Sequence, residues 1–186
     1  MRNWVILLSA CWLSASSWAS FFPDAWDRDF GGAATTYLPG YDWRLLKAQC
    51  WQESSLRPHA VSPVGAYGLC QFMPGTARDV GPRIGATPEQ FWLPEVSIRA
   101  AGAYMAQLRH TWRAERPDMD RTMLALASYN AGAGHLIRAQ SLCGGGMLYA
   151  EIAQCLPQVT GRHSDETLGY VRQIVTRWWP QMLFGG

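Results

Sequence analysis

The sequence contains little charge and no concentration of either sign. Only 16% of its 186 residues are charged, and 16 Lys and Arg residues against 14 Asp and Glu residues give a formal net charge of +2. No basic run or stripe is present, so the sequence does not indicate binding to nucleic acid, which requires a positively charged surface. The hydrophobic content of 48% is sufficient for a true core. The length fits a single domain.

A hydrophobic run long enough to cross a membrane is also lacking. The apolar stretch from Trp4 to Ala15 is shorter than the roughly 20 residues that a spanning helix needs. Arg2 precedes it, and the small residues Ser17 and Ala19 follow it at the positions that a signal peptidase reads. We therefore interpret residues 1–19 as a signal peptide that exports the protein to the periplasm.

Two other interpretations of this leader remain open. Leu8-Ser9-Ala10-Cys11 has the form of a lipoprotein cleavage box, which would lipidate Cys11 and produce an outer-membrane lipoprotein. Its leader would be unusually short, so we rank it second. An uncleaved anchor ranks third.

Alternating strand patterns, internal repeats and low-complexity linkers are absent, apart from a short ribbon expected near residues 59–67. Helical periodicity dominates instead, which predicts a mainly α fold. Asp42, Asp120 and Ser164 are expected to cap helices, and Pro94 to open a long helix that ends near Glu115. Shorter helices are expected over 135–142 and 147–156. Residues 20–40 show no helical period and predict an N-terminal arm laid over the domain, which then occupies residues 41–186.

One carboxylate occupies an unusual position in this helical pattern. Trp43, Leu46, Cys50 and Glu53 follow one another at steps of three, four and three, which places them on one face of the helix that begins at Asp42. Glu53 thus lies at the end of an apolar stripe and near a helix C-terminus, where the macrodipole disfavours negative charge. Both effects raise the pKa of a carboxyl group, as a general acid requires. The alternative is a partly exposed glutamate without a catalytic role.

The residues after Glu53 resemble a known family. Glu53-Ser54 is followed by Pro58, Ala60, Ser62, Gly65-Ala66, Gly68-Leu69, Gln71 and Met73-Pro74, in the order and spacing of the first motif of soluble lytic transglycosylases. Cys70 departs from it by replacing the usual Met. Ser128-Tyr129-Asn130-Ala131-Gly132 is similar to the A-Y-N-A-G turn of that family, and Glu166-Thr167 with Tyr170-Val171 to its last motif.

This resemblance implies a single lysozyme-like domain of the goose type with a substrate cleft. It also implies roles for individual residues. Glu53 would be the catalytic acid and then the base, Ser62 would approach the acetamido group, and Gln71 and Met73 would position sugar. Tyr129 would hold the acetamido group or the acid, Asn130 would support its turn, and Tyr170 would orient Glu53.

Four cysteines remain after export: Cys50, Cys70, Cys143 and Cys155. An even number in an oxidising compartment predicts two disulfides, and of three possible pairings we favour Cys50–Cys70 and Cys143–Cys155. The alternative is four buried thiols. No C-x-x-C or close Cys/His spacing is present, so neither a zinc site nor any other metal or cofactor is expected.

The resemblance therefore implies a peptidoglycan lytic transglycosylase. Its substrate would be the glycan strand, cleaved between N-acetylmuramic acid and N-acetylglucosamine with formation of a 1,6-anhydro end. The short mature chain is similar to accessory enzymes of conjugation, pilus and secretion systems, which would be its partners, or to a phage virion enzyme. The alternatives are a hydrolytic muramidase on the same fold and a non-catalytic wall-binding assembly protein.

Overall fold

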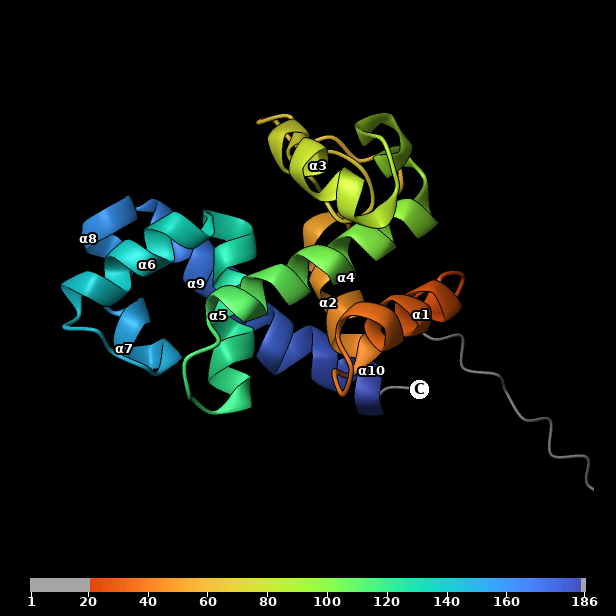
Figure 1. Ribbon diagram of the computed structural model, residues 1–186. Coiled ribbons are helices and arrows are strands. Elements are labelled where there is room, and N and C mark those ends of the chain that lie inside the picture. The colour runs from red at the N-terminus through yellow and green to blue at the C-terminus, as the bar shows by residue number, and fades with distance from the viewer. Residues whose placement is uncertain (1–20, 185–186) are drawn as a thin grey trace, which may run out of the picture.

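The computed structural model describes residues 21–184, in which every regular element is a helix (Figure 1). The predicted signal peptide and the lipidation site at Cys11 lie outside these residues. The helical elements are α1 (Asp27–Tyr37), α2 (Trp43–Ser54), α3 (Pro74–Val80), η1 (Gly81–Ile84), η2 (Pro88–Trp92), α4 (Pro94–Thr111), α5 (Asp118–Ala131), α6 (Ala133–Leu142), α7 (Tyr149–Ala153), α8 (Leu156–Thr160), α9 (His163–Gln173), η3 (Ile174–Trp178) and α10 (Trp179–Phe184).

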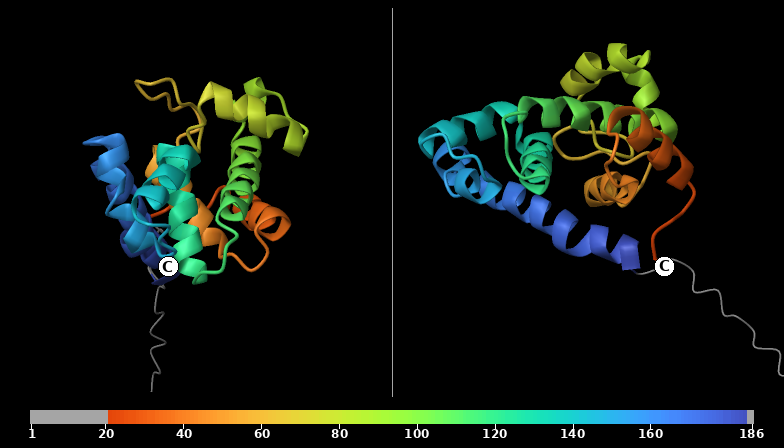
Figure 2. Two further views of the ribbon diagram at one scale, coloured as in Figure 1. Left: turned by 60° about the vertical axis from the view of Figure 1, so that its left-hand side comes forward. Right: turned by 60° about the horizontal axis from the view of Figure 1, so that its bottom comes forward.

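Helix α4 runs through the middle of the molecule and connects its parts. It packs against α1 and α2 at one end and α5 at the other, while α3, η1 and η2 cover its start (Figure 1). Helices α6, α7 and α8 gather around the far ends of α5 and α9. In Figure 2 the chain from α9 through η3 to α10 forms a long rod, and this rod contacts α5 with its first part and α2 with its last.

The described part of residues 20–40 corrects one prediction. These residues contain helix α1, with Phe30, Ala33 and Ala34 buried against the domain. The spacing of these three residues is helical, although the neighbouring Gly31-Gly32 pair obscures it. Lys47 of α2 is buried and forms a salt bridge with Asp27 at the start of α1, which links the two helices.

Two predicted caps are also wrong. Helix α5 begins at Asp118, two residues before Asp120, and the Asp120 carboxylate instead accepts a hydrogen bond from the backbone N–H of Tyr149 at 2.7 Å. Helix α9 begins at His163, and the Ser164 hydroxyl donates to the carbonyl of Gly161 at 2.7 Å. Neither side chain caps the helix in which it lies; Asp120 instead binds the first backbone N–H of α7, and Ser164 binds the turn before α9. The predicted cap at Asp42 is present, since its carboxylate accepts from the backbone N–H of Arg44 at 2.9 Å.

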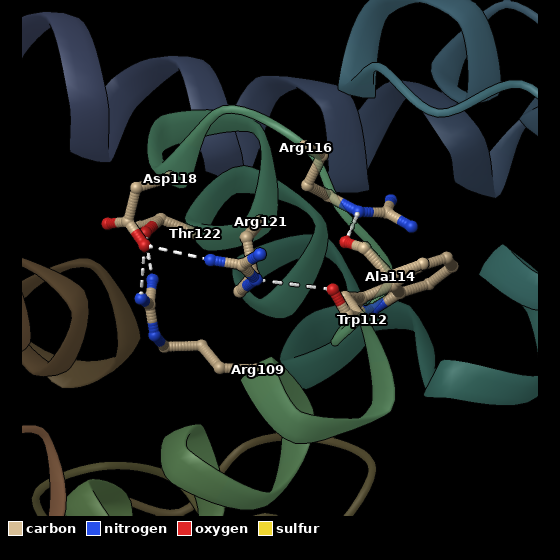
Figure 3. Close-up of polar contacts among 7 residues, drawn as sticks. All are labelled: Arg109, Trp112, Ala114, Arg116, Asp118, Arg121 and Thr122. Carbon is tan, nitrogen blue, oxygen red and sulfur yellow. Dashed lines mark hydrogen bonds and ion pairs between the residues drawn. The ribbon is translucent and has the colours of Figure 1, made fainter.

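The junction between α4 and α5 is fixed by charged side chains (Figure 3). The Asp118 carboxylate accepts hydrogen bonds from Arg109 at 2.6 Å and from Arg121 at 3.2 Å, and these bonds lower the pKa of Asp118. On the buried side, the Trp112 indole donates to the Ser128 hydroxyl at 2.9 Å. This clamp orients α5, whose last turn carries the Tyr129-Asn130 motif.

The segment between α2 and α3 is held by isolated β-bridges. Val61 pairs with Tyr67, and Tyr67 with Phe72, and the structure assigns no strand anywhere in residues 21–184. The short ribbon expected near residues 59–67 is therefore reduced to single bridges. Within the same residues, none of the helices combines the length and hydrophobicity needed to span a bilayer.

Candidate active site

Glu53 occupies the last turn of α2, at the point where the chain leaves the helix. Ser54 ends the helix, and Ser55 and Leu56 both adopt positive φ values of 56°, which turn the chain sharply away. The Glu53 side chain is half-buried, and its Oε1 accepts a hydrogen bond from the Tyr170 hydroxyl at 2.6 Å. Tyr170 itself is buried in α9, so the two helices fix the carboxyl group from two directions.

The protein environment favours the protonated form of Glu53. Desolvation by the surrounding protein is the largest effect, and it raises the pKa of Glu53 from 4.5 to about 8. The hydrogen bond from Tyr170 opposes this shift, whereas the negative charge of Glu166 adds to it. At a pKa of about 8, roughly nine-tenths of the carboxyl groups carry a proton at pH 7. Glu53 is therefore suited to donate a proton at neutral pH.

The segment after α2 is folded back onto the helix by buried bonds. The Ser54 hydroxyl donates to the carbonyl of Leu69 at 2.6 Å, and a disulfide joins Cys50 to Cys70. The other predicted disulfide, between Cys143 and Cys155, is also present, so the preferred pairing is confirmed. The first disulfide fixes the segment that carries Gln71 beside the helix that carries Glu53.

Two of the predicted sugar-binding residues hold the shape of this segment. The Ser62 hydroxyl accepts from the backbone N–H of Ala66 at 2.9 Å. The amide nitrogen of Gln71 donates to the carbonyls of Ala60 at 3.0 Å and Gly68 at 2.9 Å. Both side chains are half-buried. Met73, by contrast, is 43% exposed just before α3, where its thioether can meet a ligand.

The Tyr129-Asn130 motif lies in the last turn of α5, far from Glu53 in sequence but near it in the folded chain. The Tyr129 hydroxyl donates to the carbonyl of Cys70 at 2.9 Å, and not to Glu53. Burial raises the pKa of Tyr129, and the nearby Glu53 carboxylate raises it further, which places the two groups within electrostatic range. The Asn130 amide oxygen accepts from the Thr167 hydroxyl at 2.7 Å and so ties the turn to α9.

The structure thus brings Glu53, Tyr129 and Tyr170 together from α2, α5 and α9. A hollow of about 370 Å³ lies beside the Asn130-Ala131 turn and is lined by residues of α6, α8 and α9 that include Glu166 and Thr167, but Glu53, Tyr129 and Tyr170 are not among its lining residues. Ser62 and Met73 lie on the segment that the disulfide and the Tyr129 hydroxyl attach to this group. In the described part of the chain, no three His, Cys, Asp or Glu side chains gather as metal ligands would.

Two neighbours of this group were not identified from sequence. The Trp178 indole, at the end of η3, donates to the side-chain oxygen of Gln52 at 2.6 Å and fixes the residue beside Glu53. The Tyr104 ring, on α4, lies 5.2 Å from the Tyr129 ring. Tyr104 falls outside the apolar stripe by which the sequence predicts the buried face of α4, so periodicity gave no reason to select it.

Comparison with known proteins gives a consistent result. The family model of the transglycosylase SLT domain matches residues 33–145, which is more than half of the chain. The membrane-bound lytic murein transglycosylase F of Alcanivorax borkumensis is 41% identical over 103 residues, covering 55% of this chain and 21% of that protein. The Alteromonas mediterranea protein of the same name is 36% identical over 153 residues, covering 74% and 32%. The chain therefore spans a third or less of these relatives' length.

Solved structures share the fold over most of the described chain. The soluble lytic transglycosylase SLT70 of Escherichia coli superposes with a TM-score of 0.68 at 26% identity, covering 88% of this chain and 25% of that one. An inactive glutamate-to-glutamine mutant of the lytic transglycosylase Slt of Pseudomonas aeruginosa superposes with a TM-score of 0.68 at 28% identity, covering 87% and 25%. Helical content and these neighbours confirm the predicted mainly α, lysozyme-like fold.

Proposed function

This chain belongs to the transglycosylase SLT domain family, and on that premise we propose that it is a peptidoglycan lytic transglycosylase with Glu53 as its catalytic residue. The observation that carries the proposal is the Glu53 carboxyl group, held by Tyr170 at 2.6 Å in surroundings that raise its pKa to about 8. The substrate is the glycan strand of peptidoglycan, cleaved at the bond between N-acetylmuramic acid and N-acetylglucosamine. The relatives' names and the inactive Slt mutant support this assignment.

The reaction uses one carboxyl group twice. Protonated Glu53 gives its proton to the oxygen of the glycosidic bond, and that bond breaks as the acetamido group of the muramic residue stabilises the cation at the anomeric carbon. The Glu53 carboxylate then takes the proton of the muramic 6-hydroxyl, whose oxygen attacks the same carbon. The acid is restored, and the product is a 1,6-anhydro sugar with no water added.

An internal nucleophile suits a site with a single acid. Most glycosidases use a second carboxylate to activate water or to attack the sugar. The 6-hydroxyl is attached to the reacting sugar, and its high effective concentration allows it to compete with bulk water. Tyr170 fixes the direction in which Glu53 presents its proton. We assign Ser62, Gln71, Met73 and Tyr129 to sugar binding and Asn130 to support of the Tyr129 turn.

Mass spectrometry of digested sacculi tests the reaction type. The proposal predicts muropeptides with 1,6-anhydro ends, each lighter by one water than the hydrolytic product. Reducing ends in their place would assign the chain to the hydrolytic muramidases. The Glu53→Gln variant tests the catalytic residue on the same sacculi, and an unchanged rate of release would show that Glu53 has no catalytic role.

We also propose export to the periplasm, with local wall opening for a trans-envelope machine as the purpose. Two disulfides favour an oxidising compartment over the cytosol. The conjugation, pilus or secretion apparatus named from the resemblance stays a prediction, as do signal cleavage and lipidation at Cys11. Cell fractionation of the full chain, with and without Cys11→Ser, distinguishes a periplasmic protein from a lipoprotein.

A further inference from the structure

Three buried side-chain polar atoms of the described chain have no hydrogen-bond partner within it, and they belong to Gln49 and Tyr41. Both the amide nitrogen and the amide oxygen of Gln49 are unpaired, on a side chain with no exposure to solvent, and the third atom is the Tyr41 hydroxyl oxygen. Native proteins pair nearly all of their buried polar groups, because an unpaired group destabilises the fold. These two side chains therefore need partners other than the residues around them.

Gln49 lies one helical turn before Glu53 on α2. Residues four apart in a helix share a face, so the Gln49 side chain neighbours that of Glu53, which accepts from the Tyr170 hydroxyl at 2.6 Å. Gln52, three residues after Gln49, accepts from Trp178 of η3 at 2.6 Å. Gln49 therefore lies on the face of α2 that meets the rod of α9 and η3, beside the Tyr170–Glu53 pair.

Tyr41 approaches the same pair from the chain just before α2. Its phenol is one of the groups that raise the pKa of Tyr170, so the two phenols are within electrostatic range. The Arg109 guanidinium lies 5.4 Å from the centre of the Tyr41 ring. A hollow of about 320 Å³, lined by Tyr41, Tyr37, Arg109 and others, brings solvent to the Tyr41 side chain, whereas its hydroxyl oxygen is buried.

The Tyr170 oxygen has capacity for a further hydrogen bond. A phenol can accept as well as donate, and in residues 21–184 Tyr170 donates to Glu53 but accepts from no other group. Neither Gln49 nor Tyr41 lies within direct hydrogen-bond distance of it. An internal water typically forms about three bonds to buried groups that are otherwise unpaired. The Gln49 amide, the Tyr41 hydroxyl and the Tyr170 oxygen together offer that number.

We propose that Gln49 and Tyr41 are positioning residues, which hold internal water against the oxygen of Tyr170 and so orient the Tyr170–Glu53 pair. The inference rests on the proposed function, because it assigns both residues a part in presenting the Glu53 proton. The water donates to the Tyr170 oxygen and is bonded in turn by the Gln49 amide and the Tyr41 hydroxyl. A donor on that oxygen strengthens the bond from Tyr170 to Glu53, since hydrogen bonds in a chain polarise one another.

The charged and titratable groups around this cluster come from several elements. They are Tyr129 of α5 and Glu166 of α9 beside Glu53 and Tyr170, Arg109 of α4, Asp118 of α5 and Asp42 beside Tyr41, and the exposed Arg177 of η3 over the Trp178 ring. Gln49 is uncharged, so its substitution removes no charge. A change in the titration of Glu53 after that substitution therefore reports on hydrogen bonding and hydration.

Gln49→Met tests the amide group, because methionine is an unbranched side chain of similar length without an amide. The value of kcat should fall about two- to tenfold, the loss expected for one hydrogen bond, and KM should stay the same because Gln49 does not contact the sugar. The carbon-13 midpoint of Glu53 should rise by about 0.3 to 1 pH unit, because a weaker bond from Tyr170 favours the protonated carboxyl group.

Tyr41→Phe should act in the same direction as Gln49→Met. Tyr37→Phe is its matched control, because Tyr37 lines the same hollow but packs around Gly102 of α4, and this variant should change neither kcat nor the midpoint. In a Tyr170→Phe background the water has no phenol oxygen to support, so adding Gln49→Met should have no further effect. A crystal structure of the wild type should show water within hydrogen-bond distance of Gln49 and Tyr170.

Each outcome decides the question. A lower kcat, a higher midpoint and loss of both effects in the Tyr170→Phe background support the inference. An unchanged kcat and midpoint overturn it, and a higher melting temperature would then identify an amide that was simply unpaired. Effects of equal size in the Tyr170→Phe background would show a structural role and also overturn it. If Gln49→Met does not fold, the Tyr41→Phe midpoint and the water density decide in the same way.

The midpoint and the water density need no substrate, so they separate this inference from the proposed function. A wild type that releases no 1,6-anhydro products would contradict the proposed function alone. An unchanged midpoint in Gln49→Met and Tyr41→Phe, beside a wild type that releases those products, would overturn this inference alone.

Discussion

At the scale of single residues, the account depends on how one carboxyl group is surrounded. Glu53 receives a hydrogen bond from Tyr170, which favours its charged form, but the loss of hydration has the larger effect and favours the neutral form. The net effect is a raised pKa, so Glu53 keeps its proton at neutral pH until a more basic acceptor is present. In the proposed reaction, the bridging oxygen of the glycan becomes that acceptor as its bond to the anomeric carbon lengthens.

The first prediction concerns the pH dependence of activity. Because Glu53 must be protonated to act as the acid, kcat/KM on sacculi should stay level below the pKa of about 8 and fall as the pH rises through it. Tyr170→Phe removes the bond that lowers the pKa of Glu53. The pH at which kcat/KM falls should therefore be higher in this variant. Its maximum rate should drop about tenfold or more, because the carboxyl group is no longer oriented. An unchanged pH dependence of kcat/KM in this variant would contradict the assigned role of Tyr170.

The second prediction concerns stability. The pKa of Glu53 is higher in the folded protein, about 8, than the ordinary value of 4.5, so the folded state binds the proton more tightly. Raising the pH from 4.5 to 8 should then destabilise the wild type by up to about 1.4 kcal/mol per pH unit, whereas Glu53→Gln does not titrate. Chemical denaturation should show the advantage of Glu53→Gln growing over this window and then levelling off. The Glu115→Gln variant, which removes a carboxylate that is exposed in the folded protein, is the control.

At the scale of elements, the irregular segment between α2 and α3 matters most. It passes between helices with little secondary structure, and its form depends on a few close contacts. Gly68 has a φ of +78°, and a Cβ atom at this position would lie 2.6 Å from the carbonyl oxygen of Phe91. Gly65 also has a positive φ, of +85°, but nothing lies within 4 Å of its Cβ position.

These two glycines give a matched pair for the third prediction. Gly65→Ala should cost only the strain of the left-handed backbone, about 1 kcal/mol. Gly68→Ala adds a collision with backbone and should cost more than about 2 kcal/mol, with loss of activity as the segment shifts. Urea denaturation of both variants measures the difference, and equal costs would show that the Phe91 contact is unimportant.

The two disulfides allow the fourth prediction. Cys50–Cys70 spans 20 residues and Cys143–Cys155 spans 12, so removing either by paired Cys→Ala changes should cost roughly 3 kcal/mol. Only the first bond attaches the Gln71 segment to α2. Its loss should therefore also reduce kcat/KM at a temperature where both variants remain folded. A similar loss of activity without Cys143–Cys155 would contradict this distinction.

Much of this architecture could be predicted from local sequence signals. The Asp42 cap and the Pro94 start of α4 follow from residue types at short spacing, and the two disulfides found are the favoured one of three possible pairings. Helix α1 was missed because Gly31-Gly32 hides a stripe that becomes clear only when Phe30 and Ala33 meet the rest of the domain. Asp120 and Ser164 have the composition of caps, but tertiary contacts recruit both. Tyr104 could not be selected from sequence, because its ring packs against that of Tyr129, which is distant in sequence.

At the scale of the whole molecule, the site exists only where separate parts of the chain meet. Glu53 comes from α2, Tyr129 from α5 and Tyr170 from α9, and the Cys50–Cys70 bond adds the segment before α3. The chain corresponds to a third or less of the length of the transglycosylase F relatives. The folded domain, and not any single motif, sets the properties of the carboxyl group.

The most direct test is a titration of the Glu53 carboxyl group by carbon-13 NMR, with Glu53→Gln used to identify its resonance. A midpoint near 8 is predicted, well above the ordinary glutamate value of 4.5. A midpoint near 4.5 would mean that Glu53 is ionised at neutral pH, and it could not then serve as the proton donor on which the proposed reaction depends.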